Sequence, residues 1–215
     1  WDGLQANLWG SRTVIYDEED RVFKAWYQGT DLSMERWWAT GYATSDDGVH
    51  WDKPRLGRHE YRGSTDNNIC SLGFGPVIKD AAEPDPSKRY KFVAKGPPWP
   101  NEVRLLTSPD GIAWDDGVPI TLPEWEGRPR DIVVILRDDT ELDPDRRYKL
   151  VWQSTVRATK PGPEQVRAKN LAFGPDFEHL RHSDFNPILS PNDGRKQENH
   201  FLMLARYGED WVMPY

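Results

Sequence analysis

The 215-residue chain has a net charge of −7, 29% charged residues and a mean hydropathy of −0.81. No run of about 18 apolar residues occurs, which excludes a membrane-spanning protein. The negative charge disfavours a nucleic-acid partner, because phosphate binding depends on clustered Lys and Arg. The 11 Trp, 8 Tyr and 7 Phe argue against disorder and indicate a packed core, a surface that stacks flat ligands, or both.

The first residue is Trp1 rather than a Met, so we expect a fragment or processed product whose own N-terminus and targeting signal are out of view. The single cysteine, Cys70, cannot form an internal disulfide, and cysteine usage does not separate a reducing from an oxidising compartment. Cellular location and oligomeric state are therefore left open.

A short polar turn is repeated along the sequence. SDDGVHW (45–51) recurs as SPDGIAW (108–114), and an eroded copy, GPDFEHL, occupies 174–180. In such a turn the Asp side chain can cap neighbouring N–H groups, while Gly provides a backbone conformation that other residues resist. The repetition predicts an architecture of similar units.

Each turn is preceded by three predicted strands. The first strand is a short apolar run stopped by an Asp, as in VIYD (14–17), VIKD (77–80) and ILRD (135–138). An acidic hairpin loop and a second strand follow, within 17–27, 85–95 and 143–154. Third strands are predicted at 37–45, 102–108 and 166–173, and a short fourth strand follows each turn. Antiparallel four-stranded units with a period of about 60 residues indicate propeller blades.

We therefore predict an all-β fold, a β-propeller of four-stranded antiparallel blades. Residues 1–215 would form a single propeller domain, with blades at about 1–60, 61–122 and 123–190 and a partial fourth blade at about 191–215 that turns at 207–210. Closed propellers usually have four to eight blades. We thus expect an incomplete domain that continues in the parent protein; the alternative is a ring assembled from several short chains.

The S-x-D-G-x-x-W turns, the D-P-x-x-R-Y-K second strands and the V-I-x-D inner strands together resemble the five-bladed propeller glycoside hydrolases. This superfamily holds the invertase, levansucrase and arabinanase/β-xylosidase families, and the sequence is most similar to bacterial proteins labelled as similar to the invertase N-terminal domain. The resemblance covers the whole sequence but rests on blade scaffolding. It implies a five-bladed parent, a carbohydrate substrate, and three carboxylates at one mouth of the ring.

These carboxylates are expected on the first, third and fourth blades: a nucleophile or base, a transition-state stabiliser or pKa modulator, and a general acid. On the third blade the candidate is Asp131, ahead of its apolar inner strand, with Arg128 and Arg130 beside it to pair with the carboxylate and bind sugar hydroxyls. The match to the family's R-D-P motif is partial, because Ile132 replaces the Pro. A strand-leading Asp that caps a turn is the alternative.

On the fourth blade the candidate acid is Glu198, with His200 able to hydrogen-bond it. A Glu desolvated by nearby rings has the raised pKa that a general acid needs. The first blade is less clear. Counting back from Asp17 and Asp80 by the spacing that separates Asp131 from Asp138 leads to Gly10 and Gly73, so neither the first nor the second blade has a carboxylate there.

Asp2 is the nearest carboxylate on the first blade and becomes the possible third member; a solvated terminal residue is its alternative. On the second blade Asn67 and Asn68 either contact a sugar or shape a turn. Aromatic rings in loops or at strand starts can stack on a sugar ring, and the candidates are Trp9, Trp37, Trp38 and Trp125.

Other chemistries have little support. The five His residues show no metal-ligand spacing and Cys70 has no partner, so we expect neither a metal site nor a cofactor. No nucleotide-binding or G-x-S-x-G motif occurs. Two alternatives stay open: a non-catalytic carbohydrate-binding or interaction propeller, and a sialidase-like enzyme. The turn is similar to the sialidase Asp-box but one residue shorter, and the arginine triad and nucleophilic Tyr of such enzymes are not placed.

Overall fold

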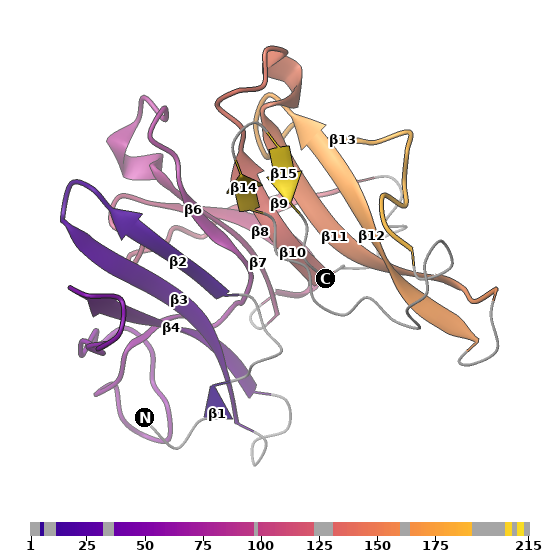
Figure 1. Ribbon diagram of the computed structural model, residues 1–215. Helices are drawn as coiled ribbons and strands as arrows, with labels where there is room; N and C mark the ends of the chain where they lie inside the picture. The colour runs from indigo at the N-terminus through magenta and orange to yellow at the C-terminus, as the bar shows by residue number, and fades with distance from the viewer. Residues whose placement is uncertain are drawn as a thin grey trace. The chain divides into compact units, whose positions relative to one another are not determined.

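The computed structural model describes residues 5–6, 12–31, 37–96, 99–122, 131–159, 164–190, 205–207 and 210–212. The protein divides into two compact units, unit 1 (Trp1–Pro119) and unit 2 (Ile120–Tyr215). The described secondary structure consists of β-strands and two single 3₁₀ turns, Pro86–Lys88 and Pro144–Arg146 (Figure 1). None of the described helices is long and apolar enough to cross a membrane.

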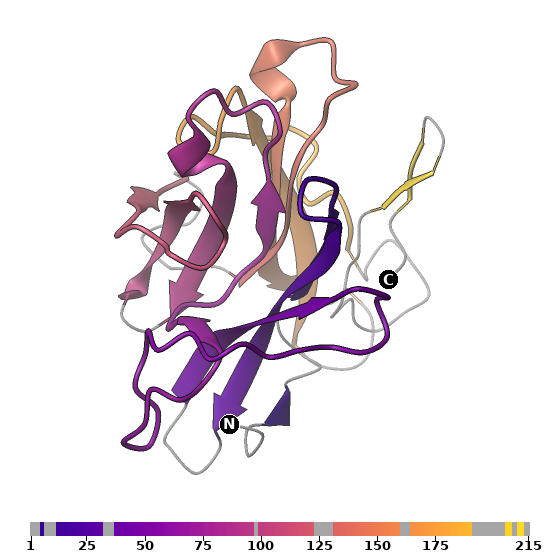
Figure 2. The same ribbon diagram turned by 90° about the vertical axis from the view of Figure 1, so that its left-hand side faces the viewer.

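Sheet 1 is an antiparallel meander at the start of unit 1. Its strands are β2 (Arg12–Asp17), β3 (Val22–Asp31), β4 (Trp37–Ser45) and β5 (Ile69–Ser71). The two-residue β1 (Gln5–Ala6) pairs with the far end of β3, opposite Gly29 and Thr30. Figure 2 shows this meander in indigo and purple, with a long loop between β4 and β5.

Two further sheets repeat the meander. Sheet 2 comprises β6 (Val77–Lys79), β7 (Tyr90–Gly96), β8 (Trp99–Ser108) and β9 (Val118–Ile120). Sheet 3, in unit 2, comprises β10 (Asp131–Arg137), β11 (Tyr148–Arg157), β12 (Gln165–Gly174) and β13 (Arg181–His182). A short hairpin of β14 (Ala205–Tyr207) and β15 (Asp210–Val212) follows. The predicted first, second and third strands of all three units are confirmed.

The fourth strand of sheet 1 differs from the prediction. In sheets 2 and 3 the fourth strand lies shortly after the repeated turn, but in sheet 1 it is β5, at Ile69–Ser71. It therefore lies past the boundary at residue 60 that the repeat predicts. The reason is an inserted loop, residues 46–68, in which the β-pairing consists of isolated bridges such as Thr44 with Asp52.

The Asp of the repeated turn caps the following backbone in the same way in each copy. Asp47 Oδ1 accepts hydrogen bonds from the N–H groups of Val49 and His50, at 2.8 and 2.7 Å. The equivalent carboxylate oxygens of Asp110 and Asp176 accept from the residues two and three positions on. Caps of this kind satisfy N–H groups that a turn would otherwise leave unpaired. The turn motif is thus a local structure that needs no ligand.

A second repeated feature ties the first strand of each sheet to its second strand. A lysine on the second strand reaches the Asp that follows or ends the first. The pairs are Lys24–Asp17, Lys91–Asp80 and Lys149–Asp138, at 2.8, 3.5 and 2.9 Å. The three carboxylates are buried. Because a buried carboxylate is stable only with a partner, these pairs explain why each apolar run is followed by an Asp and an R-Y-K or similar triplet.

Sheets 1 and 2 pack against each other within unit 1. Their shared core includes Trp26 and Tyr42 from sheet 1 and Tyr90, Phe92 and Leu106 from sheet 2. The Trp26 indole N–H donates to the Gly111 carbonyl at 2.6 Å, which joins the β3 core to the second copy of the turn. Burying several aromatic side chains in this way stabilises the unit.

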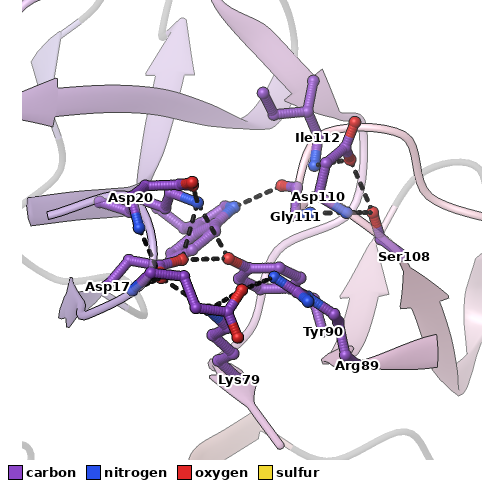
Figure 3. Close-up of polar contacts among 12 residues, drawn as sticks. Asp17, Asp20, Lys79, Arg89, Tyr90, Ser108, Asp110, Gly111 and Ile112 are labelled. Carbon is purple, nitrogen blue, oxygen red and sulfur yellow. Dashed lines mark hydrogen bonds and ion pairs between the residues drawn. The ribbon is translucent and has the colours of Figure 1, made fainter. Parts of the chain in front are cut away.

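A buried ionic cluster adjoins this core (Figure 3). Asp17, with no exposed surface, accepts hydrogen bonds from Lys24 and Lys79 and from the Tyr90 hydroxyl, at 2.8, 2.6 and 2.5 Å. Arg89 pairs with Glu19 at its edge. Burial by itself raises the pKa of Asp17, but the donors outweigh burial and hold that pKa well below its ordinary value.

Candidate functional site

Asp131 is the first residue of β10, as the sequence predicts for a carboxylate that leads an inner strand. It lies opposite Gln153 on β11, and its side chain is exposed. The Gln153 amide Nε2 donates to Asp131 Oδ2 at 3.4 Å. On the other side of Gln153, the buried Lys169 Nζ donates to the Gln153 Oε1 at 2.6 Å. Sequence reasoning did not single out Gln153 or Lys169.

The sheet register shows which residue takes the Asp131 position in sheet 2. Gln153 lies four residues after Lys149, and the residue four after Lys91 is Lys95, whose bridge partner is Phe74. The equivalent of Asp131 in sheet 2 is therefore Phe74 rather than Gly73. The count along the sequence differs by one because β10 contains a bulge between Ile132 and Val134. The prediction that sheet 2 has no carboxylate there holds for either residue.

In sheet 1 the corresponding second-strand position is Gln28, four residues after Lys24. Its side chain is 1% exposed, and neither its Nε2 nor its Oε1 has a hydrogen-bond partner in the described part of the protein. It pairs across the sheet with Thr40, whose hydroxyl donates to the Gly73 carbonyl. Sheets 1 and 3 thus share a glutamine at this position, but only in sheet 3 does a described acid side chain engage it.

Asn67 and Asn68 are both buried and both bonded within sheet 1 and its loop. The Asn67 amide donates to the carbonyls of His59 and Ser64, and its Oδ1 accepts from the Ile69 N–H. The Asn68 Nδ2 donates to the Tyr27 hydroxyl and the Tyr42 carbonyl, both at 2.7 Å. These contacts correspond to the turn-shaping alternative.

Of the predicted ring platforms, Trp38 has a described side chain. Its ring stacks on Phe74, with centroids 4.8 Å apart and planes inclined by 23°. Trp37 begins β4. The other predicted site residues lie outside the described residues; these are Asp2, Trp9, Trp125, Arg128, Arg130, Glu198 and His200.

A further polar group lies where β3 ends, and sequence reasoning missed it. Asp31 Oδ2 accepts from the Tyr61 hydroxyl at 2.6 Å and from Arg62 Nη2 at 2.8 Å. Tyr61 and Ser64 close a two-residue turn, in which Arg62 and Gly63 both have positive φ. This contact docks the 46–68 loop on the strand end. The local sequence does not predict this contact, because its partners are about 30 residues apart.

A metal site has no support in the described ranges, where no group of three or more His, Cys, Asp or Glu side chains is placed to hold an ion. The described chemistry at the start of β10 is that of a carboxylate, an amide and an ammonium group. Such a set can bind hydroxyl groups and stabilise positive charge on the carboxylate side.

Comparison with known proteins gives matches in structure alone. No family model matches the sequence, and no curated protein matches it. Among solved structures, the protein aligns over 95% of its length with one described as a BT0996 RGII complex, with a TM-score of 0.63 and 13% identity. It aligns over 94% with a glycosyl hydrolase from Bacteroides ovatus, with a TM-score of 0.56 and 15% identity.

A third structure decides the fold assignment together with these two. It is described as a structure of the GH130 family, which "contains glycoside hydrolases that target beta-1,2 mannosidic linkages in Candida mannan". It aligns with 94% of this protein, with a TM-score of 0.53 and 16% identity. The protein has the fold of the propeller glycoside hydrolases. The predicted all-β propeller class is therefore confirmed, as is the resemblance at the level of the propeller fold.

The sequence spans 64%, 60% and 60% of these three propeller structures, which is less than two thirds of each. At 13 to 16% identity the likeness concerns the fold, and fold alone does not fix substrate or activity.

Proposed function

We propose that the protein is part of a glycoside hydrolase that acts on an oligo- or polysaccharide by carboxylate chemistry. In this proposal Asp131 is the transition-state stabiliser or pKa modulator, Glu198 is the general acid and Asp2 is the nucleophile or base. Arg128, Arg130, His200 and the rings of Trp9, Trp37, Trp38 and Trp125 would contact the sugar. A propeller fold shared with glycoside hydrolases is the background to the proposal.

The observation that carries the proposal is the setting of Asp131. It is an exposed carboxylate at the first position of β10, and a hydrogen bond from Gln153 orients it. Hydrolysis of a glycosidic bond needs an acid on one side and a carboxylate that attacks, activates water or stabilises the oxocarbenium-like transition state. An exposed and oriented Asp is suited to the second kind of role. An Asp that only caps a turn instead accepts from backbone N–H groups, as Asp47 Oδ1 does from Val49 and His50.

The test is turnover by the full-length protein on aryl glycosides and on plant or bacterial polysaccharides. Asp131→Asn and Glu198→Gln should each lower kcat by at least about 1,000-fold without unfolding the protein. Asp184→Asn is the matched control, because Asp184 is an exposed Asp of the same unit outside the proposed site. Retention of most activity by Asp131→Asn removes Asp131 from the mechanism, and retention by Glu198→Gln removes the acid.

One observation favours a second candidate, a carbohydrate-binding propeller. Sheet 2 has Phe74 at the Asp131 position, and this ring stacks on Trp38 instead of providing a carboxylate. Rings of this kind bind sugars by stacking. If the protein binds oligosaccharides in calorimetric titrations but hydrolyses none, and if Trp38→Ala weakens binding while Asp131→Asn does not, this second function replaces the first.

A further inference from the structure

Three side chains form a row across neighbouring strands of sheet 3. Asp131 on β10 pairs with Gln153 on β11, and Gln153 pairs with Lys169 on β12. Residues directly opposite one another in an antiparallel sheet direct their side chains to the same face. The two hydrogen bonds, at 2.6 Å from Lys169 and 3.4 Å from Gln153, follow this row.

Burial changes steadily along the row. The Lys169 residue is 0% exposed, Gln153 is half-buried, and Asp131 is exposed. A fully buried ammonium group is costly to desolvate and is retained in a fold when its donors are satisfied. An apolar residue would fill this core position at lower cost. The row therefore connects a cation inside the sheet with a carboxylate at the surface.

Lys169 also determines which way the Gln153 amide points. An ammonium group can only donate, so the oxygen of the amide must face Lys169. The NH₂ group is then directed to the Asp131 carboxylate, which can only accept when ionised. With the opposite orientation, the amide oxygen would face the carboxylate and the NH₂ group would face the ammonium group. Lys169 thus keeps the NH₂ group of Gln153 directed at the Asp131 carboxylate, to which it donates.

The row is not a requirement of the blade architecture. In sheet 2 the equivalent positions are Phe74, Lys95 and Val103. In sheet 1, Gln28 pairs with Thr40. A lysine at the third position therefore occurs only in sheet 3 among the three described meanders, together with the carboxylate proposed to act on the sugar.

We infer that Lys169 is a positioning residue that acts through Gln153 to hold the Asp131 carboxylate in the orientation its work requires. This inference rests on the proposed glycosidase function for its consequence, but the relay itself is a structural claim that can be measured separately. Misplacing a reacting group by about 1 Å can cost about 100-fold in rate. Loss of Lys169 should therefore lower kcat by about 10-fold to 100-fold, with KM changed by less than about threefold.

The relay is tested first by NMR of the full-length protein with ¹⁵N-labelled glutamine side chains. The Gln153 signal is assigned by its loss in Gln153→Glu. Lys169→Met and Asp131→Asn should each move the Gln153 NH₂ signals and speed their exchange with water. Lys149→Met is the matched control, because it removes a lysine from the same sheet that pairs with Asp138 and Glu141 instead. It should leave the Gln153 signals in place.

Kinetics on the best substrate found then separate positioning from simple structural support. Gln153→Glu keeps a partner for Lys169 but places a second negative charge beside Asp131, so the fold should stay intact while kcat falls. Lys149→Met should lower stability and leave kcat unchanged. If Lys169→Met does not fold, the kcat of Gln153→Glu tests whether the side chain between Lys169 and Asp131 positions the Asp131 carboxylate.

The inference is overturned if Lys169→Met leaves both the Gln153 signals and kcat unchanged, or if Gln153→Glu retains full activity. A protein that hydrolyses none of the substrates contradicts the proposed function instead, and the NMR comparison still accepts or rejects the relay. The two failures are therefore distinguishable.

Discussion

Lys24 in sheet 1 and Tyr90 in sheet 2 are 66 positions apart, yet the Lys24 Nζ donates to the Tyr90 hydroxyl at 2.9 Å. Both groups also bind Asp17 Oδ2. One carboxylate oxygen thereby joins a residue of its own sheet to a residue of the next. The repeated Asp–Lys pair, which within sheets 2 and 3 ties two strands, has become in sheet 1 part of the contact between two sheets.

Asp17→Asn should destabilise unit 1 strongly. The substitution removes the buried carboxylate that Lys24 and Lys79 share and leaves them only the exposed carboxylates of Asp20 and Glu19. Breaking a buried pair in this way costs about 3–5 kcal/mol. Urea denaturation followed by tryptophan fluorescence measures the change. Asp20→Asn is the control, since the Asp20 side chain is 59% exposed and should contribute less than about 1 kcal/mol. Equal effects of the two substitutions would contradict the cluster's role.

Stability should fall in acid. For Asp138, burial raises the pKa, but Lys149 and Thr140 outweigh burial and lower it to about 2. The pKa of Asp17 is also lowered. A carboxylate whose pKa is lower in the folded state stabilises the fold above its unfolded pKa, near 4, and this contribution is lost as pH falls through the folded pKa.

The expected result is a melting temperature that decreases as pH falls from about 4 to about 2. Asp138→Asn should be less stable than the wild type at pH 7, and part of the decrease should disappear in this variant. A wild-type melting temperature that stays constant over this interval would show that neither carboxylate is linked to folding.

Gly111→Ala should cost more than Gly48→Ala, although both glycines have the same place in the repeated turn and φ values of +78° and +74°. Either substitution pays for a backbone conformation that alanine resists, roughly 1 kcal/mol. A Cβ on Gly111 would also lie 2.5 Å from the buried Trp26 ring, whereas one on Gly48 would be 3.4 Å from the Phe23 ring. Thermal denaturation of the two variants gives the difference directly, and similar losses would contradict the packing of Trp26 on the turn.

Asp31→Asn should loosen the docked loop. The Asp31 side chain is 6% exposed and holds Tyr61 and Arg62, so removing its charge should lower stability by about 1–3 kcal/mol. Amide hydrogen exchange should become faster at residues 61–64. Asp66→Asn tests an exposed pair in the same loop, Arg55 with Asp66 at 3.0 Å, and should have little effect. Unchanged exchange at the turn would show that Asp31 does not anchor it.

Much of the fold could be predicted from the sequence because each sheet repeats its own local signals. The Asp-Gly turn, the Asp after the first strand and the R-Y-K second strand are short-range features whose spacing gives strand order. The 46–68 loop could not be placed in this way. Its docking depends on contacts such as Asp31 with Tyr61, and these join segments whose sequences give no sign of each other.

The candidate site was predicted in part. Asp131 at the start of β10 follows from the apolar run behind it, but its partners follow only from sheet register. Aligning Lys24, Lys91 and Lys149 as one column would have pointed to Gln153, four residues on, and to Gln28 in the first unit. Counting seven residues back from Asp80, the spacing between Asp131 and Asp138, leads to Gly73, whereas the sheet register gives Phe74. The two differ by one because the bulge in β10 adds a residue to the first strand that has no partner on the second strand.

The Gln28 amide, which has no hydrogen-bond partner among the described residues, also suggests a way to stabilise the protein. Burying two polar atoms without partners in the described structure lowers the stability of the fold, and a methionine of similar shape at position 28 would not carry this cost. A more robust version of this protein could therefore start from this interior position rather than from its surface charges. Measuring the activity of Gln28→Met would also show whether function requires the Gln28 amide.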